Sequence, residues 1–140
     1  MHATADHTRR TALHVAVEQG RPTLARLLCE HGATVDALDL AGNAPLHVAA
    51  MHGDATTTRV LLAFGADVNR PDHAGRTPLH LGVGVASRLD VCRPLIAHRA
   101  DVNAVDADRF TPLDMALLDC ADDDPIVTYL VDEGAVTSRM

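Results

Sequence analysis

The sequence contains no tryptophan and no lysine, and only one tyrosine, two phenylalanines and three cysteines in 140 residues. Aromatic residues make up 2% of the chain and hydrophobic residues 47%, so leucine, alanine and valine must fill the core, which suits thin, closely packed helices. Cys29, Cys92 and Cys120 are an odd number and lie far apart, whereas disulfide frameworks and metal sites need paired spacing. We therefore expect three reduced structural thiols.

Long hydrophobic runs are also absent. No apolar run approaches the roughly 18 residues of a membrane span, and the first six residues lack the apolar core of a signal peptide. The sequence therefore predicts an intracellular protein, in the cytoplasm or the nucleus, that does not insert into a membrane.

The sequence has no cluster of positive charge. All 12 basic residues are arginines, and the formal net charge is −7. Residues 71–140 carry 12 acidic residues and 6 arginines, against 7 and 6 in residues 1–70, so the second half is the acidic one. Sequence-independent nucleic-acid binding needs a basic stripe, so we expect no nucleic acid as a partner.

The dominant positive feature is an internal repeat. Variants of Thr-Pro-Leu-His occur four times, with spacings of 33, 33 and 34 residues between Leu13, Leu46, Leu79 and Leu113. A second motif, complete as Gly-Ala-Asp-Val-Asn at residues 65–69 and partial elsewhere, keeps step with the first. Self-similarity at this period is the mark of a stacked-repeat protein.

These motifs resemble the ankyrin repeat, whose pattern runs Asp-x-x-Gly-x-Thr-Pro-Leu-His through a helix pair to Gly-Ala-Asp-Val-Asn. The resemblance covers the chain from about Asp6 to Ala135. It implies an all-α fold, a solenoid of stacked helix-turn-helix units joined by hairpin-like loops, in which each unit packs only on its neighbours. We expect a single domain over residues 1–140, with repeats at about 6–38, 39–71, 72–105 and 106–138.

Several residues depart from the pattern. Arg9 occupies a loop position where the family has glycine, and Thr57 is a poor helix former near the start of the second outer helix. Gly82 and Gly84 interrupt the third inner helix, and Pro94 cannot donate a helix hydrogen bond. We expect a local bulge or a shortened helix in the third repeat.

The fourth repeat departs from the pattern in two places. Asp114 replaces the motif histidine, as suits a terminal repeat without a following neighbour. An acidic run, Asp119 and Asp122 to Asp124, precedes Pro125. The run predicts an N-cap and first-turn proline on a helix whose dipole favours acidic residues. An acidic patch for a basic partner is the alternative.

The histidines do not indicate catalysis. His14, His47 and His80 recur at the end of the Thr-Pro-Leu-His motif. The resemblance implies that each hydrogen-bonds backbone and threonine groups and ties the loop of one repeat to the next. The sequence contains no nucleophile motif, phosphate-binding glycine loop or zinc motif, so we expect no enzyme activity, no cofactor and no metal.

The resemblance implies a protein-protein interaction module, an adaptor or inhibitor-type scaffold, that binds through loop tips and the exposed side of the inner helices. Transfer of those positions to repeats 2 to 4 gives ten candidate partner-binding residues: Leu40, Asn43, Met51, His52, His73, Arg76, Asp108, Phe110, Leu118 and Asp119.

Leu40, Met51 and Phe110 are apolar where nothing structural demands it, and large apolar and arginine side chains are typical of interface centres. We therefore predict a groove over repeats 2 to 4 for a protein segment, although scattered exposed apolar residues also occur on any surface. The alternative is a regulatory or spacer segment of a larger, possibly enzymatic, protein. Neither end carries a strongly polar capping helix, which favours a fragment or self-association through the ends. We expect a monomer, with self-association through the uncapped ends as the alternative.

Overall fold

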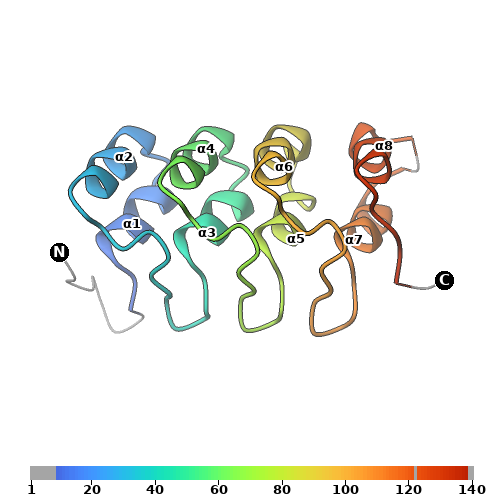
Figure 1. Ribbon diagram of the computed structural model, residues 1–140, viewed down its shortest axis with the longest axis horizontal. Coiled ribbons are helices and arrows are strands. Elements are labelled where there is room, and N and C mark those ends of the chain that lie inside the picture. Colours follow the sequence, from blue (N-terminus) through green and yellow to red (C-terminus); the bar gives the residue numbers. More distant parts are fainter. Residues whose placement is uncertain (1–8, 122, 139–140) are drawn as a thin grey trace.

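The computed structural model describes residues 9–121 and 123–138, which form eight helices and no β-strand. Consecutive helices form four pairs, stacked so that first helices lie in an inner row and second helices in an outer row (Figure 1). The inner helices are α1 (Ala12–Glu18), α3 (Pro45–Met51), α5 (Pro78–Gly82) and α7 (Pro112–Asp119). The outer helices are α2 (Pro22–Glu30), α4 (Ala55–Ala63), α6 (Arg88–Ala97) and α8 (Pro125–Asp132). The predicted all-α solenoid is confirmed.

The start of each inner helix follows from its local sequence. Thr77 is the N-cap of α5, and its hydroxyl accepts a hydrogen bond from the His80 N–H at 3.4 Å. A second hydrogen bond runs the other way, because Nδ1 of the His80 ring accepts from the Thr77 N–H at 3.1 Å. Pro78 fills the first helical position, where its missing N–H has no helical partner in any case. Thr111 caps α7 in the same way.

The three motif histidines link successive repeats. His14 Nε2 lies 2.8 Å from the Asn43 carbonyl oxygen. His80 Nε2 lies 2.8 Å from that of Phe110, and His47 bonds its next loop in the same way. Since Nδ1 accepts from a backbone N–H, Nε2 carries the proton and donates it to the next repeat's loop. These fully buried rings therefore have the predicted structural role.

The hydrophobic core is a strip rather than a central cluster. Motif leucines of the inner row pack with leucines of the outer row along the whole stack, and each pair of helices contacts only its neighbours. The buried leucines of the described residues are Leu13, Leu46, Leu61, Leu62, Leu79, Leu81, Leu95, Leu113 and Leu130.

Two early departures from the pattern are absorbed locally. Arg9 adopts a positive φ of 64°, close to the 80° of the loop glycine Gly42, so the loop conformation survives without glycine. At the start of α4, the Asp54 carboxylate accepts from the Thr57 N–H at 3.0 Å and from its hydroxyl at 2.6 Å. This cap offsets the low helix propensity of threonine.

In the third repeat the shortening falls on the inner helix. α5 has only 5 residues, whereas α6 has 10 and continues through the buried Pro94. The expectation of a shortened helix in the third repeat is confirmed for α5, whereas Pro94 does not shorten α6. A Cβ on Gly82 would lie 3.1 Å from Val91 Cγ1 and 3.3 Å from Cys92 Sγ, so this glycine lets α6 pack closely on α5.

Candidate protein-binding surface

Three loops at the edge of the inner row share one construction. In the loop of residues 72–76, the Asp72 carboxylate oxygen Oδ1 accepts from the Ala74 and Arg76 N–H groups, both at 2.9 Å. Asp39 and Asp106 make the same pairs of bonds in loops 39–43 and 106–110. Each aspartate therefore fixes its loop tip and leaves the next side chain exposed, as with Leu40 at 53% exposure.

The three tips are joined edge to edge. The His73 N–H donates to the Ala41 carbonyl at 3.4 Å, and the Ala107 N–H donates to that of Ala74 at 2.8 Å. The His73 ring lies over Gly42, where a Cβ would come within 2.4 Å of ring atom Cδ2. The loops, side by side in Figure 1, thus form a continuous structure, which we call the loop ridge (residues 39–43, 72–76 and 106–110).

The last residue of each loop is half-buried: Asn43, Arg76 and Phe110. The Arg76 guanidinium is already paired within its loop, because Nε and Nη2 each lie 3.2 Å from Asp72 Oδ2. Phe110 and Asp108 line a pocket of about 230 Å³ together with Arg109 and Ser138. The ridge therefore offers a held guanidinium near its middle and a partly open aromatic ring at its C-terminal end.

The remaining candidates lie where the inner helices end. Met51 and His52 are exposed at the end of α3, and Leu118 and Asp119 are exposed at the end of α7. Leu118 is the most exposed large hydrophobic residue of the described chain, at 71%. The short helix α5 lies between these two places, so the structure unites the loop candidates but keeps the helix candidates apart (Figure 1).

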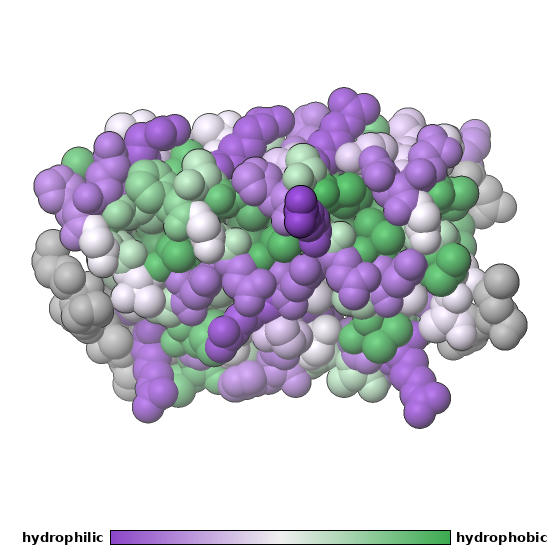
Figure 2. Space-filling view, in the orientation of Figure 1, coloured by the Kyte–Doolittle hydropathy of each residue, from purple (hydrophilic) through white to green (hydrophobic). Residues whose placement is uncertain are grey.

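The surface shows no single hydrophobic band on the face in Figure 2. Hydrophobic patches over the helices alternate with hydrophilic side chains from one repeat to the next. Recognition on this face would therefore combine separate apolar contacts with polar ones, as in the rim and core of ordinary interfaces.

The three cysteines do not have the lowered thiol pKa of a reactive nucleophile. Burial raises the pKa of Cys92 to about 12 and also raises the pKa of Cys29. For Cys120, burial and the nearby carboxylates of Asp124 and Asp119 raise the pKa against the opposing effect of Arg88. A thiol must ionise to act as a nucleophile. Within residues 9–121 and 123–138, no group of three or more His, Cys, Asp or Glu residues could hold a metal ion.

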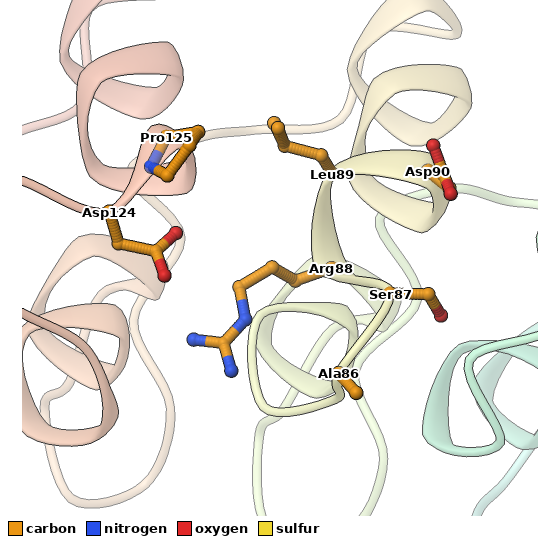
Figure 3. A pocket seen from close by; sticks show the side chains of 7 residues that line it. All are labelled: Ala86, Ser87, Arg88, Leu89, Asp90, Asp124 and Pro125. Atoms are coloured by element: carbon orange, nitrogen blue, oxygen red, sulfur yellow. The ribbon is translucent and has the colours of Figure 1, made fainter.

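A pocket that the sequence did not indicate lies between the third and fourth repeats. It has a volume of about 390 Å³ and is lined by residues 86–90 from the start of α6 and by Asp124 and Pro125 from the start of α8. The Arg88 side chain extends across it toward Asp124 (Figure 3) and contacts Cys120 Sγ. The acidic run before α8 contributes Asp124 to this pocket.

The acidic run itself has the predicted capping role. The Asp124 carboxylate accepts from the Ile126 N–H at 2.9 Å, and Pro125 begins α8. Asp119 and Asp123 are exposed, whereas Asp122 lies outside the described residues.

Stacked helix pairs linked by buried histidines define a helical repeat protein. A family model of ankyrin repeats in three copies matches residues 46–139, and one of ankyrin repeats in many copies matches residues 13–62. The chain belongs to the ankyrin repeat family, whose members are generally protein-protein interaction modules and typically non-enzymatic. No curated protein matches it. None of the helices formed by the described residues is long and apolar enough to cross a membrane.

Proposed function

We propose that this chain is an adaptor or inhibitor-type scaffold that binds a protein segment along the loop ridge and the exposed ends of α3 and α7, without chemistry of its own. The observation that carries this proposal is the linkage of the ridge. Backbone bonds join the three tips, and an aspartate fixes each of them. A surface held in this way loses little conformational entropy when a partner binds.

The candidate residues divide into apolar and polar contacts. Leu40, Met51 and Leu118 offer exposed apolar side chains to a partner. Asp108 and Asp119 bring exposed carboxylates to the fourth repeat, so the bound segment would place basic residues there. Arg76 is held by Asp72 and presents a fixed guanidinium, which favours planar acidic or aromatic groups.

The test compares two triple variants of equal charge change. The first carries Leu40→Asp, Met51→Asp and Leu118→Asp on the proposed surface. The control carries Thr56→Asp, Ala63→Asp and Ala97→Asp at exposed positions of the outer helices. Arg76 is left intact, because its replacement would also remove the ion pair that supports its own loop.

The wild type and both variants are first compared by circular dichroism and urea unfolding, and then used as baits in lysate of the source organism. We expect partners captured by the wild type to be kept by the control and lost by the surface variant. Retention of the same partners by the surface variant, or their loss only from the control, would contradict the proposed surface.

A further inference from the structure

The C-terminal end of the stack exposes side chains at positions that are covered elsewhere. Leu117 on α7 is 38% exposed and Val131 on α8 is 53% exposed. In the other three repeats a further helix pair follows, and the corresponding side chains are buried or half-buried. The residues that correspond to Leu117 are Val17, Ala50 and Val83, and those that correspond to Val131 are Cys29, Leu62 and Ile96. Leu117 and Val131 therefore mark the face that each repeat presents to its successor, which we call the C-face.

The N-terminal end shows the opposite half of the same contact. Leu27 on α2 is 49% exposed, and Leu24 is half-buried. They line a shallow pocket of about 430 Å³ with Arg21, Pro22 and Thr23. In the later repeats a helix pair precedes, and the corresponding residues are more enclosed: Val60, Pro94 and Tyr129 for Leu27, and Thr57, Val91 and Ile126 for Leu24. Leu24 and Leu27 therefore mark the face toward a preceding repeat, the N-face.

The charged side chains at the two ends of the stack are compatible with contact between a C-face and an N-face. Residues 106–138 contain nine acidic residues and one arginine, whereas residues 6–38 contain four of each. Arg21 is exposed at the N-face pocket, and Asp132 and Glu133 are exposed beside Val131. An N-face and a C-face brought together would thus place an arginine near carboxylates.

We propose that a second copy of this chain docks head to tail, with the C-face of one copy packed on the N-face of the next. The contact continues the helix packing that already joins α2 to α4 and α4 to α6 within one chain. It goes beyond the proposed function and does not rest on it, because the end faces are separate from the loop ridge.

The loop side of the C-face limits how the second copy docks. Asp114 accepts from the Ser138 N–H at 3.1 Å and from its hydroxyl at 2.7 Å. A carboxylate cannot donate to the loop carbonyl that a motif histidine would bind, so the junction is made by the helices. Because the two faces differ, each docking leaves one free face of each kind, and assembly grows with concentration into chains or closes into rings.

The experiment uses the 140-residue chain and two variants that each block one face, Leu27→Asp and Val131→Asp. Both positions are exposed, so circular dichroism and urea unfolding should match the wild type. By sedimentation velocity and light scattering, we expect the wild type to form larger species as its concentration rises, and each variant alone to stay monomeric. An equal mixture of the variants should form a dimer that grows no further, because only one functional junction remains. The matched control Ala63→Asp, on the outer side of α4, should associate like the wild type.

Two results would overturn the proposal. The first is a wild type that stays monomeric up to roughly 1 mM, beyond the range of a specific contact. The second is association of the wild type without dimer formation in the mixture, which would indicate a two-fold symmetric contact instead. Neither result bears on partner capture by the loop ridge, so the two proposals can fail separately.

Discussion

The second and fourth helix pairs share one sequence pattern but differ in how they are enclosed. In α3, every residue from Pro45 to Ala50 is buried between neighbouring pairs. In α7, the same register leaves Leu117, the counterpart of the buried Ala50, 38% exposed. The helices themselves begin in the same way, each with a proline at its first position. The comparison shows that local sequence determines where a helix begins, while much of its burial comes from the repeats on either side.

The two pairs also differ at the motif histidine. His47 donates to the Arg76 carbonyl in the following loop, at 3.2 Å. Asp114 instead accepts from the N–H and hydroxyl of Ser138, a residue that follows its own helix pair. Both side chains accept from the backbone N–H at their own helix start. The residue type at this position therefore matches the group that it faces. Histidine donates where the next loop presents a carbonyl, and aspartate accepts where Ser138 presents an N–H and a hydroxyl.

The strongest test of this comparison truncates the same leucine in both pairs. Leu46→Ala should lower the free energy of unfolding by about 4 kcal/mol and Leu113→Ala by about 2 kcal/mol, the upper and lower parts of the usual range for such cavities. The interior site is held by repeats on both sides, whereas the terminal site can collapse toward solvent. Urea unfolding monitored by circular dichroism measures both values. An equal or larger loss for Leu113→Ala would show that the terminal repeat is as tightly enclosed as the second.

A smaller effect should come from removing the polar link. His47→Ala leaves the buried Ala44 N–H and the Arg76 carbonyl without their partner, which should cost about 1–3 kcal/mol. Asp114→Ala also leaves the buried Thr111 N–H without its partner, but it should cost less, because the other partner, Ser138, is exposed and can bond to water instead. Urea unfolding gives the stabilities, and hydrogen exchange at the Ala44 amide should accelerate only in the first variant. His31→Ala, at an exposed histidine, serves as the control and should change stability by less than about 0.5 kcal/mol.

The smallest expected effect is a difference in acid sensitivity. Burial lowers the pKa of His14 and His47 below 6.5, against the upward effects of carbonyl hydrogen bonds and nearby aspartates. A folded-state pKa below the unfolded value means that their contribution to stability is complete above pH 6.5 and is lost as the pH falls toward the folded pKa.

Asp114 responds at lower pH. Burial alone would raise its pKa, but hydrogen bonds from Thr111 and Ser138 together lower it below 3.8. Its contribution is therefore lost only as the pH falls from 3.8 toward the folded pKa. Hydrogen exchange followed from neutral to acidic pH should show the first and second repeats loosening before the contacts of Asp114 are lost. If the first and second repeats and the contacts of Asp114 loosened at the same pH, the inferred pKa shifts of these histidines and of Asp114 would be contradicted.

Much of the fold could be predicted because its signals are local. The inner-helix caps, the linking histidines and the Asp124 cap each depend on a few residues at fixed spacing. The sequence did not show which helix of the third repeat would be short: α5 ends at Gly82, whereas α6 continues through the buried Pro94. The positive φ of 69° at Arg109 was also missed, although Arg9 has the same exception. The division at residues 38, 71 and 105 stays a prediction.

The candidate site was less accessible to sequence reasoning. Exposure of Leu40 follows from its place in the loop motif, but the packing of His73 on Gly42 depends on how two loops meet. The exposure of Val131 could not be read from the pattern either, because its counterpart Leu62 is buried by a following repeat. Whether the ten residues bind a partner stays a prediction.

The junction between the last two repeats is closed on one side and open on the other. At the loop side, His80 and Ala107 tie the repeats through hydrogen bonds of 2.8 Å each. At the outer side, the 390 Å³ pocket lies between the starts of α6 and α8. In mechanical terms, the loop edge is a hinge axis, and the fourth repeat is the part of the stack that rotates about it most easily. A change in curvature of the stack would therefore concentrate at this junction, because α7 and α8 contact the preceding helix pair less extensively than the earlier pairs contact one another.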